Sequence, residues 1–147
     1  MALAGMTREQ TNDYNREHCK RIALDLENYV NGSVYRCAEC DEILILPDDV
    51  GDKYRCPNCG SVQEVDNMEQ LSIWDYMSDA LDFQFLVNSR KEVIAVKILV
   101  TFGGPNIWID TESQNVELYW WTDRASYPLS SDVVEALDEW AEEYFQC

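Results

Sequence analysis

Apolar side chains recur at helical spacing near both ends of the chain, and this pattern predicts two helices. The first spans about residues 8–30, with Thr7 and Gln10 placed as a capping box and Asn31-Gly32 as its end. Its apolar positions are Tyr14, Cys19, Ile22, Ala23, Leu26, Tyr29 and Val30. The second spans about 131–145 and is capped by Ser130 or Ser131. Its predicted buried stripe is Val133, Val134, Leu137, Trp140, Ala141, Tyr144 and Phe145.

Between these helices the period shortens to two, which predicts strands. A short helix is expected at 72–81, before strands at about 83–87, 94–102, 107–109 and 116–121. Because their connections are short, we expect an antiparallel meander of about four strands. The expected fold class is α+β, with helices on one face of the sheet and a small module inserted after the first helix.

The inserted module carries two C-x-x-C pairs, Cys37 with Cys40 and Cys56 with Cys59. Two cysteines three residues apart on a tight turn can reach one ion, and a second such turn completes the tetrahedral thiolate set that Zn²⁺ prefers. Gly60 lets the backbone curl around the last sulfur. We therefore predict one structural zinc per chain, with no open coordination position. Two alternatives remain: a redox dithiol, which needs only one pair, and iron, which the same ligands suit.

Residues 33–66 resemble the zinc-ribbon family, with a hairpin expected from 42–46 and 53–55 around the turn at 47–51. The chain is accordingly divided into an N-terminal helix (1–32), the zinc-ribbon module (33–66) and an α+β domain (67–147). Zinc ribbons often bind nucleic acid, but acidic residues outnumber basic ones in this module. A contact with another protein, or a purely structural role, is therefore the better prediction.

Charge is the most unusual feature of the composition. The 147 residues hold 28 acidic and 11 basic side chains, a formal net charge of −17. Residues 36–147 carry 23 of the acids and only seven of the bases. Such a surface repels nucleic acid and anionic membranes and attracts basic partners, although acidic surfaces also serve solubility alone. Without a membrane-spanning stretch or a signal-peptide pattern, we expect a cytoplasmic protein.

The C-terminal helix concentrates this charge, because it has six acidic residues and no basic one. Each pair of like charges one turn apart destabilises a helix by roughly a few tenths of a kcal/mol. The row therefore either is a solvated face or imitates spaced phosphates and docks in a cleft that normally holds nucleic acid. The candidate partner-binding residues are Asp132, Glu135, Asp138, Glu139, Glu142 and Glu143. Two further acidic groups could extend the surface: Asp48, Asp49 and Asp52, and Asp75, Asp79 and Asp82.

No catalytic set is evident from the sequence. His18 is the only histidine and is interpreted as an ordinary helix residue, and Cys19 and Cys147 as ordinary thiols. The neighbouring aromatic residues Trp108, Tyr119, Trp120 and Trp121 are predicted to be core, with an exposed patch for a protein partner as the alternative. We therefore predict no enzymatic activity.

The run 102–111, the segment 116–121, the opening segment 13–21 and the paired cysteines together resemble small proteins of phages and mobile elements in Firmicutes. In size and charge the chain is also similar to anti-CRISPR proteins. This resemblance implies an inhibitor acting in the bacterial host cell on a basic nucleic-acid-binding protein, such as an RNA-guided type II CRISPR nuclease, and blocking nucleic-acid loading. The rival hypothesis is a zinc-ribbon adaptor in mobile-element replication, transfer or transcription. Neither predicts a direct nucleic-acid or membrane partner.

Overall fold

The computed structural model describes residues 5 and 7–146 and contains helices and antiparallel sheets, as expected for the α+β class. The helices are α1 (Arg8–Val30), α2 (Ile73–Met77) and α3 (Ser131–Gln146), with a short 3-10 helix η1 (Val65–Asn67). The strands of the first half are β1 (Val34–Arg36), β2 (Ile43–Ile45), β3 (Lys53–Arg55), β4 (Val62–Glu64) and β5 (Glu69–Gln70). Those of the second half are β6 (Asp82–Val87), β7 (Val93–Thr101), β8 (Asn106–Asp110), β9 (Asn115–Trp120) and β10 (Asp123–Pro128).

The strands form three sheets rather than the single four-stranded sheet expected from the sequence. The largest is a five-stranded antiparallel meander in the order β10-β9-β8-β7-β6. Its unpredicted fifth strand is β10, whose sequence Asp-Arg-Ala-Ser-Tyr-Pro has only Ala125 and Tyr127 packed against the core. A strand with so few inward apolar residues gives little period-two signal, so it is hard to detect from sequence alone.

Local capping sets the ends of the long helices where the sequence predicted them. Thr7 accepts a hydrogen bond from the backbone N–H of Gln10 at 3.1 Å, and the Gln10 side chain accepts one from the N–H of Thr7 at 3.0 Å. The helix ends at Asn31, after which Gly32 adopts a φ of +76°. At α3 the cap is Ser130, whose hydroxyl accepts from the N–H of Val133 at 3.3 Å.

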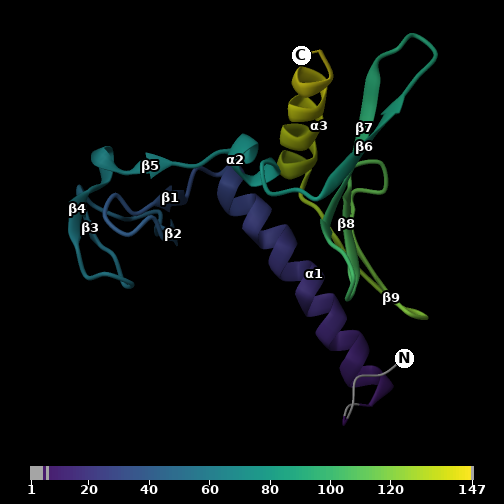
Figure 1. Ribbon diagram of the computed structural model, residues 1–147, viewed down its shortest axis with the longest axis horizontal. Coiled ribbons are helices and arrows are strands. Elements are labelled where there is room, and N and C mark those ends of the chain that lie inside the picture. The colour runs from purple at the N-terminus through teal and green to yellow at the C-terminus, as the bar shows by residue number, and fades with distance from the viewer. Residues whose placement is uncertain (1–4, 6, 147) are drawn as a thin grey trace.

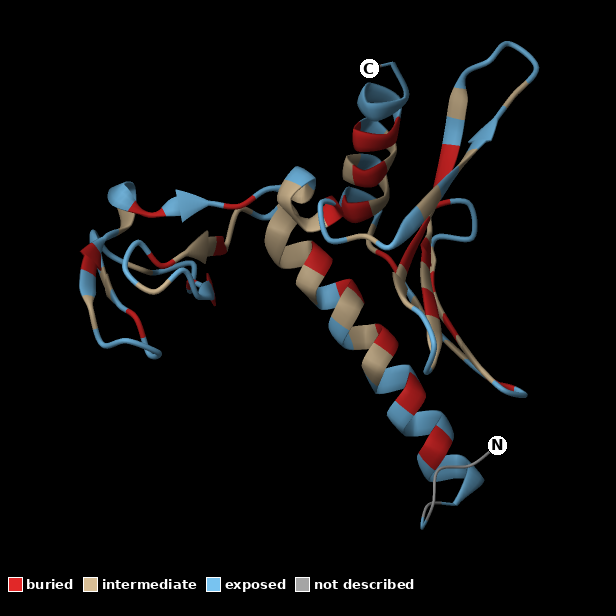
Figure 2. Cartoon of the chain, in the orientation of Figure 1, coloured by how far each residue is buried: buried red, intermediate tan, exposed pale blue. Residues whose placement is uncertain are grey.

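Helices α1 and α3 lie on the same face of the five-stranded sheet (Figure 1). The core between them joins residues such as Leu26 of α1, Ile98 and Ile109 of the sheet and Leu137 of α3, all of which are fully buried. Figure 2 shows that buried residues recur along α1 and α3. The described helices leave the opposite face of the sheet open, so Trp108 on that face is only half-buried.

The metal module projects away from this core, beyond the C-terminal end of α1 (Figure 1). The expected hairpin between 42–46 and 53–55 is wrong. Strand β2 pairs with β1, and β3 pairs with β4, so each C-x-x-C pair lies in the turn of its own hairpin. Strand β5 adds to β1 as the third strand of the first hairpin's sheet. This arrangement explains the repeated sequence Tyr-Arg-Cys before each turn, because the two hairpins are structural equivalents.

The module has a small core of its own, formed by Cys37, Leu44, Leu46, Cys56 and Met68. The sequence-based division at residues 32 and 66 stays a prediction. None of the described helices combines the length and apolar character needed to cross a bilayer.

Candidate metal centre and acidic face

The four cysteines predicted as ligands come together in the structure. Their sulfur atoms all lie within 4.8 Å of one another. Cys37 Sγ is 3.7 Å from Cys59 Sγ, and Cys40 Sγ is 3.7 Å from Cys56 Sγ. Four sulfurs about 2.3 Å from a central ion would be separated by about 3.8 Å in a regular tetrahedron. The cluster can therefore hold one metal ion, and the spacing fits a tetrahedral four-thiolate site.

Each pair of cysteines is shaped by a turn with the same hydrogen bonds. In the first turn the N–H of Cys37 donates to the carbonyl of Glu42 at 2.8 Å. In the second, the N–H of Cys56 donates to the carbonyl of Ser61 at 2.9 Å. These bonds close the hairpins immediately outside the cysteines, so the ligands are positioned by backbone pairing rather than by a flexible loop.

The residue after each second cysteine has a left-handed backbone. Asp41 has a φ of +63° and Gly60 a φ of +77°. Glycine adopts this conformation without steric cost, and aspartate is among the few other residues that tolerate it. The prediction that Gly60 lets the backbone curl past the sulfur is consistent with this geometry, and Asp41 performs the same function in the first turn.

Gln63 connects the two hairpins beside the ligands, and sequence reasoning missed it. Its side chain donates to Cys37 Sγ at 2.9 Å and accepts from the backbone N–H of Ala38 at 2.8 Å. The equivalent position in the first hairpin is Leu44, which is buried and apolar. No motif distinguishes Gln63 from any other strand glutamine, so its contact with a ligand could be found only from the structure.

The surroundings of the cluster favour a thiolate at Cys37 and oppose one at Cys59. The backbone N–H of Cys40, helped by Gln63, lowers the pKa of the Cys37 thiol to about 6. At Cys59 the backbone N–H of Ser61 lowers the pKa, but partial burial and the three neighbouring sulfurs outweigh it and raise the pKa to about 12. Full ionisation of all four thiols therefore requires a bound cation to offset their mutual repulsion.

A metal held by four thiolates has no open position for substrate, so its function here would be structural. The same sulfur tetrahedron suits zinc and iron, and the geometry does not choose between them. The cysteines of the described chain are all free thiols.

The predicted acidic row on α3 is largely exposed, and one of its members differs from the others. Asp132, Glu135, Glu139, Glu142 and Glu143 are exposed, whereas Asp138 is half-buried. Burial raises the pKa of Asp138, and the Thr111 hydroxyl partly opposes this by donating to the carboxylate. The row is thus an exposed ridge with Asp138 along its base.

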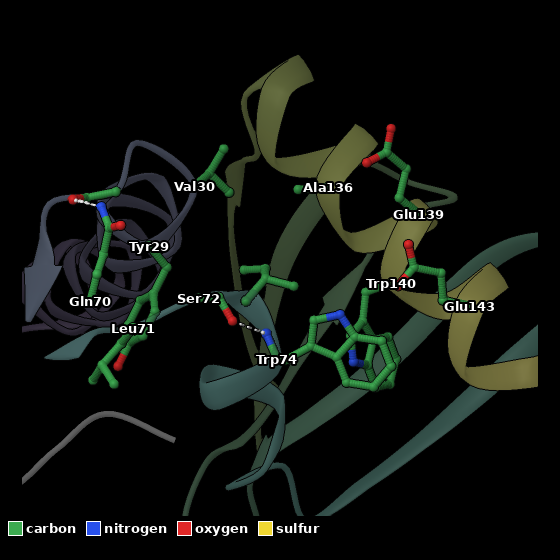
Figure 3. A pocket seen from close by; sticks show the side chains of 12 residues that line it. Tyr29, Val30, Gln70, Leu71, Ser72, Trp74, Ala136, Glu139, Trp140 and Glu143 are labelled. Carbon is green, nitrogen blue, oxygen red and sulfur yellow. Dashed lines mark hydrogen bonds between the residues drawn. The ribbon is translucent and has the colours of Figure 1, made fainter. Parts of the chain in front are cut away.

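Grooves lie on both sides of this ridge. One, of about 450 Å³, combines apolar Val93, Ile94 and Val134 with the carboxylates of Glu135, Asp138, Glu139 and Glu142. The other, of about 390 Å³, lies between the C-terminal end of α1, the segment before α2, and α3. Figure 3 shows Glu139 and Glu143 projecting from α3 beside Trp74 and Trp140 in this second groove. Carboxylates therefore flank apolar surface on either side of the helix.

Six aromatic rings pack together at the end of α3, and we refer to them as the aromatic cluster. Its members are Trp74, Phe83, Phe85, Trp140, Tyr144 and Phe145. Tyr144 and Phe145 were predicted as buried, but they are 42% and 45% exposed. Trp74 is 44% exposed, and its ring centroid lies 5.9 Å from that of Trp140. Helical periodicity identifies the face these residues occupy but not whether the sheet extends far enough to cover them.

The tryptophans of the central strands have different environments. Trp120 packs against the core, as predicted. Trp108 lies beneath Lys97, whose Nζ is 4.9 Å from the ring centroid. Tyr119 lies beneath Arg124 in the same way, at 5.6 Å. Trp121 forms the tip of the β9–β10 hairpin, is 75% exposed and has a φ of +56°. The prediction that these rings are core is therefore confirmed for Trp120 and wrong for Trp121, whereas Trp108 and Tyr119 lie half-buried on the face that the helices leave open.

The remaining residues of interest from the sequence have simpler roles. Cys19 is fully buried, and burial raises the pKa of its thiol to about 11, which makes it unreactive at neutral pH. Burial and the nearby Arg21 lower the pKa of His18. Cys147 lies outside the described residues.

The two further acidic groups do not extend the α3 row as a whole. Asp75 caps α2 by accepting a hydrogen bond from the N–H of Ser72 at 2.7 Å, so it has a structural role. Asp48, Asp49 and Asp52 lie on the metal module rather than beside α3.

Comparison of the chain with protein-family models, with curated proteins and with solved structures yields no match.

Proposed function

We propose that the protein is a non-enzymatic inhibitor whose fold is stabilised by one zinc ion at Cys37, Cys40, Cys56 and Cys59. Its acidic α3 face docks on a basic, nucleic-acid-handling protein of the bacterial host. The favoured target is an RNA-guided type II CRISPR nuclease, in which the α3 face blocks the loading of guide or target nucleic acid. The zinc ion holds the module together and takes no part in chemistry.

The observation that carries this proposal is the concentration of carboxylates on α3. The ion pairs that join Arg8 to Asp123, Arg36 to Glu69 and Arg90 to Glu92 lie away from Glu135, Glu139 and Glu142 of α3. The helix has no lysine or arginine that could neutralise its own charge. A helix selected only for solubility and stability would gain from mixed charges at i and i+4. This uniform ridge instead suits a partner that provides the positive charge.

The grooves beside α3 explain how charge and affinity could be combined. Carboxylates at a rim accelerate association with a basic surface, while buried apolar contacts supply most of the binding free energy. Here the rim is formed by Glu135, Glu139 and Glu142, and the apolar floor includes Val134 and Ile94. Binding should therefore be strong at low salt and should weaken as salt screens the charges, since the Debye length falls to about 8 Å at physiological ionic strength.

The proposal is tested by titrating the purified, zinc-loaded protein into type II CRISPR nucleases and measuring cleavage of matched DNA. We expect inhibition of at least one nuclease, with less inhibition at higher salt. In a triple variant, Glu135→Gln, Glu139→Gln and Glu142→Gln, the protein concentration needed for half-maximal inhibition should be roughly tenfold higher or more than for the unaltered protein.

The matched control removes three charges from exposed positions on α1 and the metal module: Glu9→Gln, Glu17→Gln and Glu64→Gln. It should inhibit nearly as well as the unaltered protein. Nucleases that stay fully active at micromolar excess in low salt would refute the inhibitor proposal. Equal losses of inhibition in the two triple variants would show that inhibition depends on net charge and not on the α3 ridge.

A second candidate function, the mobile-element adaptor, is favoured by a different surface. Ile43, Ile45 and Val62 on the metal module are 49%, 53% and 53% exposed. They lie on β2 and β4, away from the α3 face. An adaptor that used the module would lose its partner on Ile45→Ser but keep it after neutralisation of α3, and the inhibitor would show the reverse.

A further inference from the structure

The two edges of the five-stranded sheet are protected very differently. At the β10 edge, α1 packs along the strand, and Arg16 donates a hydrogen bond to the carbonyl of Ser126 at 3.0 Å. The Arg16 guanidinium also lies over the Tyr127 ring, and Pro128 ends the strand without an N–H donor. This edge is covered by a helix and is closed to further strands.

At the other edge, β6 pairs only with β7 among the described strands. Every second residue of an antiparallel edge strand directs its N–H and C=O away from its neighbour. Natural sheets protect such edges with lysine, proline, inward charges or bulges. Strand β6 has the sequence Asp-Phe-Gln-Phe-Leu-Val, with its one charge at the first position and a register shift only between Leu86 and Val87. Most of its length is a regular, apolar and unprotected edge.

The aromatic cluster lies against this strand. Phe83 of β6 is 4.9 Å from Tyr144, and Phe85 is 5.5 Å from Phe145, measured between ring centroids. Because neighbouring strands are about 4.8 Å apart, side chains of a strand added to β6 would reach these half-exposed rings. Backbone pairing and ring burial are thus available at one place.

The charges around the edge decide what kind of strand would bind. Exposed carboxylates flank it at Asp79 and Asp82, and Glu142 and Glu143 lie on the last turns of α3 beside the cluster. At the β6–β7 turn, Glu92 is paired with Arg90 and Lys91 is exposed, so the acidic end of the edge is the one at Asp79 and Asp82. A second copy of this chain would bring another net charge of −17 to the same place. Coulomb repulsion therefore disfavours pairing between two β6 strands, whereas an extended segment that carries lysine or arginine would be attracted.

We propose that β6 is a β-augmentation site, at which an extended basic segment of the partner protein adds as a sixth strand and inserts its apolar side chains against the aromatic cluster. The inference deepens the proposed function and rests on it for the basic character of the partner. It adds the binding mode. Main-chain hydrogen bonds to β6 would give affinity, and the acidic rim would select a segment of positive charge.

The test uses the zinc-loaded full chain and a synthetic peptide of alternating lysine and valine, and it measures amide hydrogen exchange by NMR. We expect saturable binding, with exchange of alternate β6 amides slowed by about tenfold or more while β10 amides are unchanged. A peptide of alternating glutamate and valine should have no effect. Slowed exchange is the distinguishing signature, because side-chain docking on α3 would shift resonances without protecting β6.

A matched pair of variants provides the control. Leu86 on β6 and Leu24 on α1 are 42% and 41% exposed, so a lysine at either position changes charge and exposure equally. Leu86→Lys should weaken peptide binding by about tenfold through repulsion at the edge, and Leu24→Lys should leave it unchanged. Unprotected β6 amides at saturating peptide, equal effects of the two lysines, or β6 protection by self-association without peptide would overturn the proposal. Because this assay contains no nuclease, its failure is distinguishable from that of the inhibitor proposal.

Discussion

Replacing Gln63 with leucine should weaken metal binding without removing any ligand. The side chain makes two hydrogen bonds that hold the metal module together, to Cys37 Sγ at 2.9 Å and from the Ala38 N–H at 2.8 Å. Leucine is of similar size, so the change removes both bonds and leaves the volume of the side chain nearly the same. The Cys37 thiolate loses a donor, and the Ala38 N–H loses its acceptor.

The magnitude follows from what such bonds contribute near a metal. Outer hydrogen bonds to ligands typically change metal affinity by about 10–100-fold, or about 1.4–2.8 kcal/mol. The pKa of Cys37 should also rise from about 6 toward the ordinary thiol value, because one of the groups that lower it is gone. At neutral pH a larger fraction of Cys37 then carries a proton that zinc must displace, and this weakens the apparent zinc affinity further.

The assay is competition for zinc against a chromophoric chelator at pH 7, with the unaltered protein as reference. Gln84→Leu is the control, since Gln84 is exposed on β6 and outside the module. We expect Gln63→Leu to weaken zinc binding by at least an order of magnitude, roughly, and Gln84→Leu to have no effect. An affinity of Gln63→Leu indistinguishable from that of the control would refute the assignment of Gln63 as the residue that orients Cys37.

Three other predictions concern stability. Removal of metal by a strong chelator should accelerate amide exchange throughout 33–66 and leave β7–β9 protected, because the two regions have separate cores; exchange that accelerates equally in both would contradict this. Burial raises the pKa of Asp138, so its contribution to stability is greatest at acid pH and is lost as pH rises through the raised pKa. Asp138→Asn should therefore raise the denaturation midpoint at pH 7 and have little effect near pH 3, and the opposite order would show that the charged carboxylate is stabilising. Trp121→Gly should raise the free energy of unfolding by about 1 kcal/mol by relieving the left-handed φ of +56°, and a loss of stability in urea would show that the ring contributes more than the strain costs.

The features predicted well from sequence depend on local chemistry. Helix α1 begins and ends where Thr7, Gln10 and Asn31 indicated, because capping involves residues only a few positions apart. The four metal ligands could also be predicted from sequence, since the spacing within each C-x-x-C pair is set by one turn. The pairing of the module strands could not be predicted, because the segment between the two turns can form one hairpin or can link two hairpins.

Features that depend on distant contacts were missed. Strand β10 is held by β9 and by α1, and its own residues are mostly polar. Exposure of Tyr144 and Phe145 depends on where the β6 edge lies, which helical periodicity does not encode. Gln63 became notable only when β4 brought it to Cys37 across 26 residues of sequence. In each case the information lies in the tertiary arrangement and not in any local pattern.

The fold of residues 33–66 depends most directly on a single metal ion enclosed by four thiolates. Native mass spectrometry of protein purified without added chelator, combined with elemental analysis, measures both the stoichiometry and the identity of the metal. We predict one zinc per chain, with a mass that exceeds that of the fully reduced metal-free chain by one zinc less two protons. A metal-free folded chain, a chain loaded with iron, or a mass that indicates disulfides among these cysteines would contradict the account.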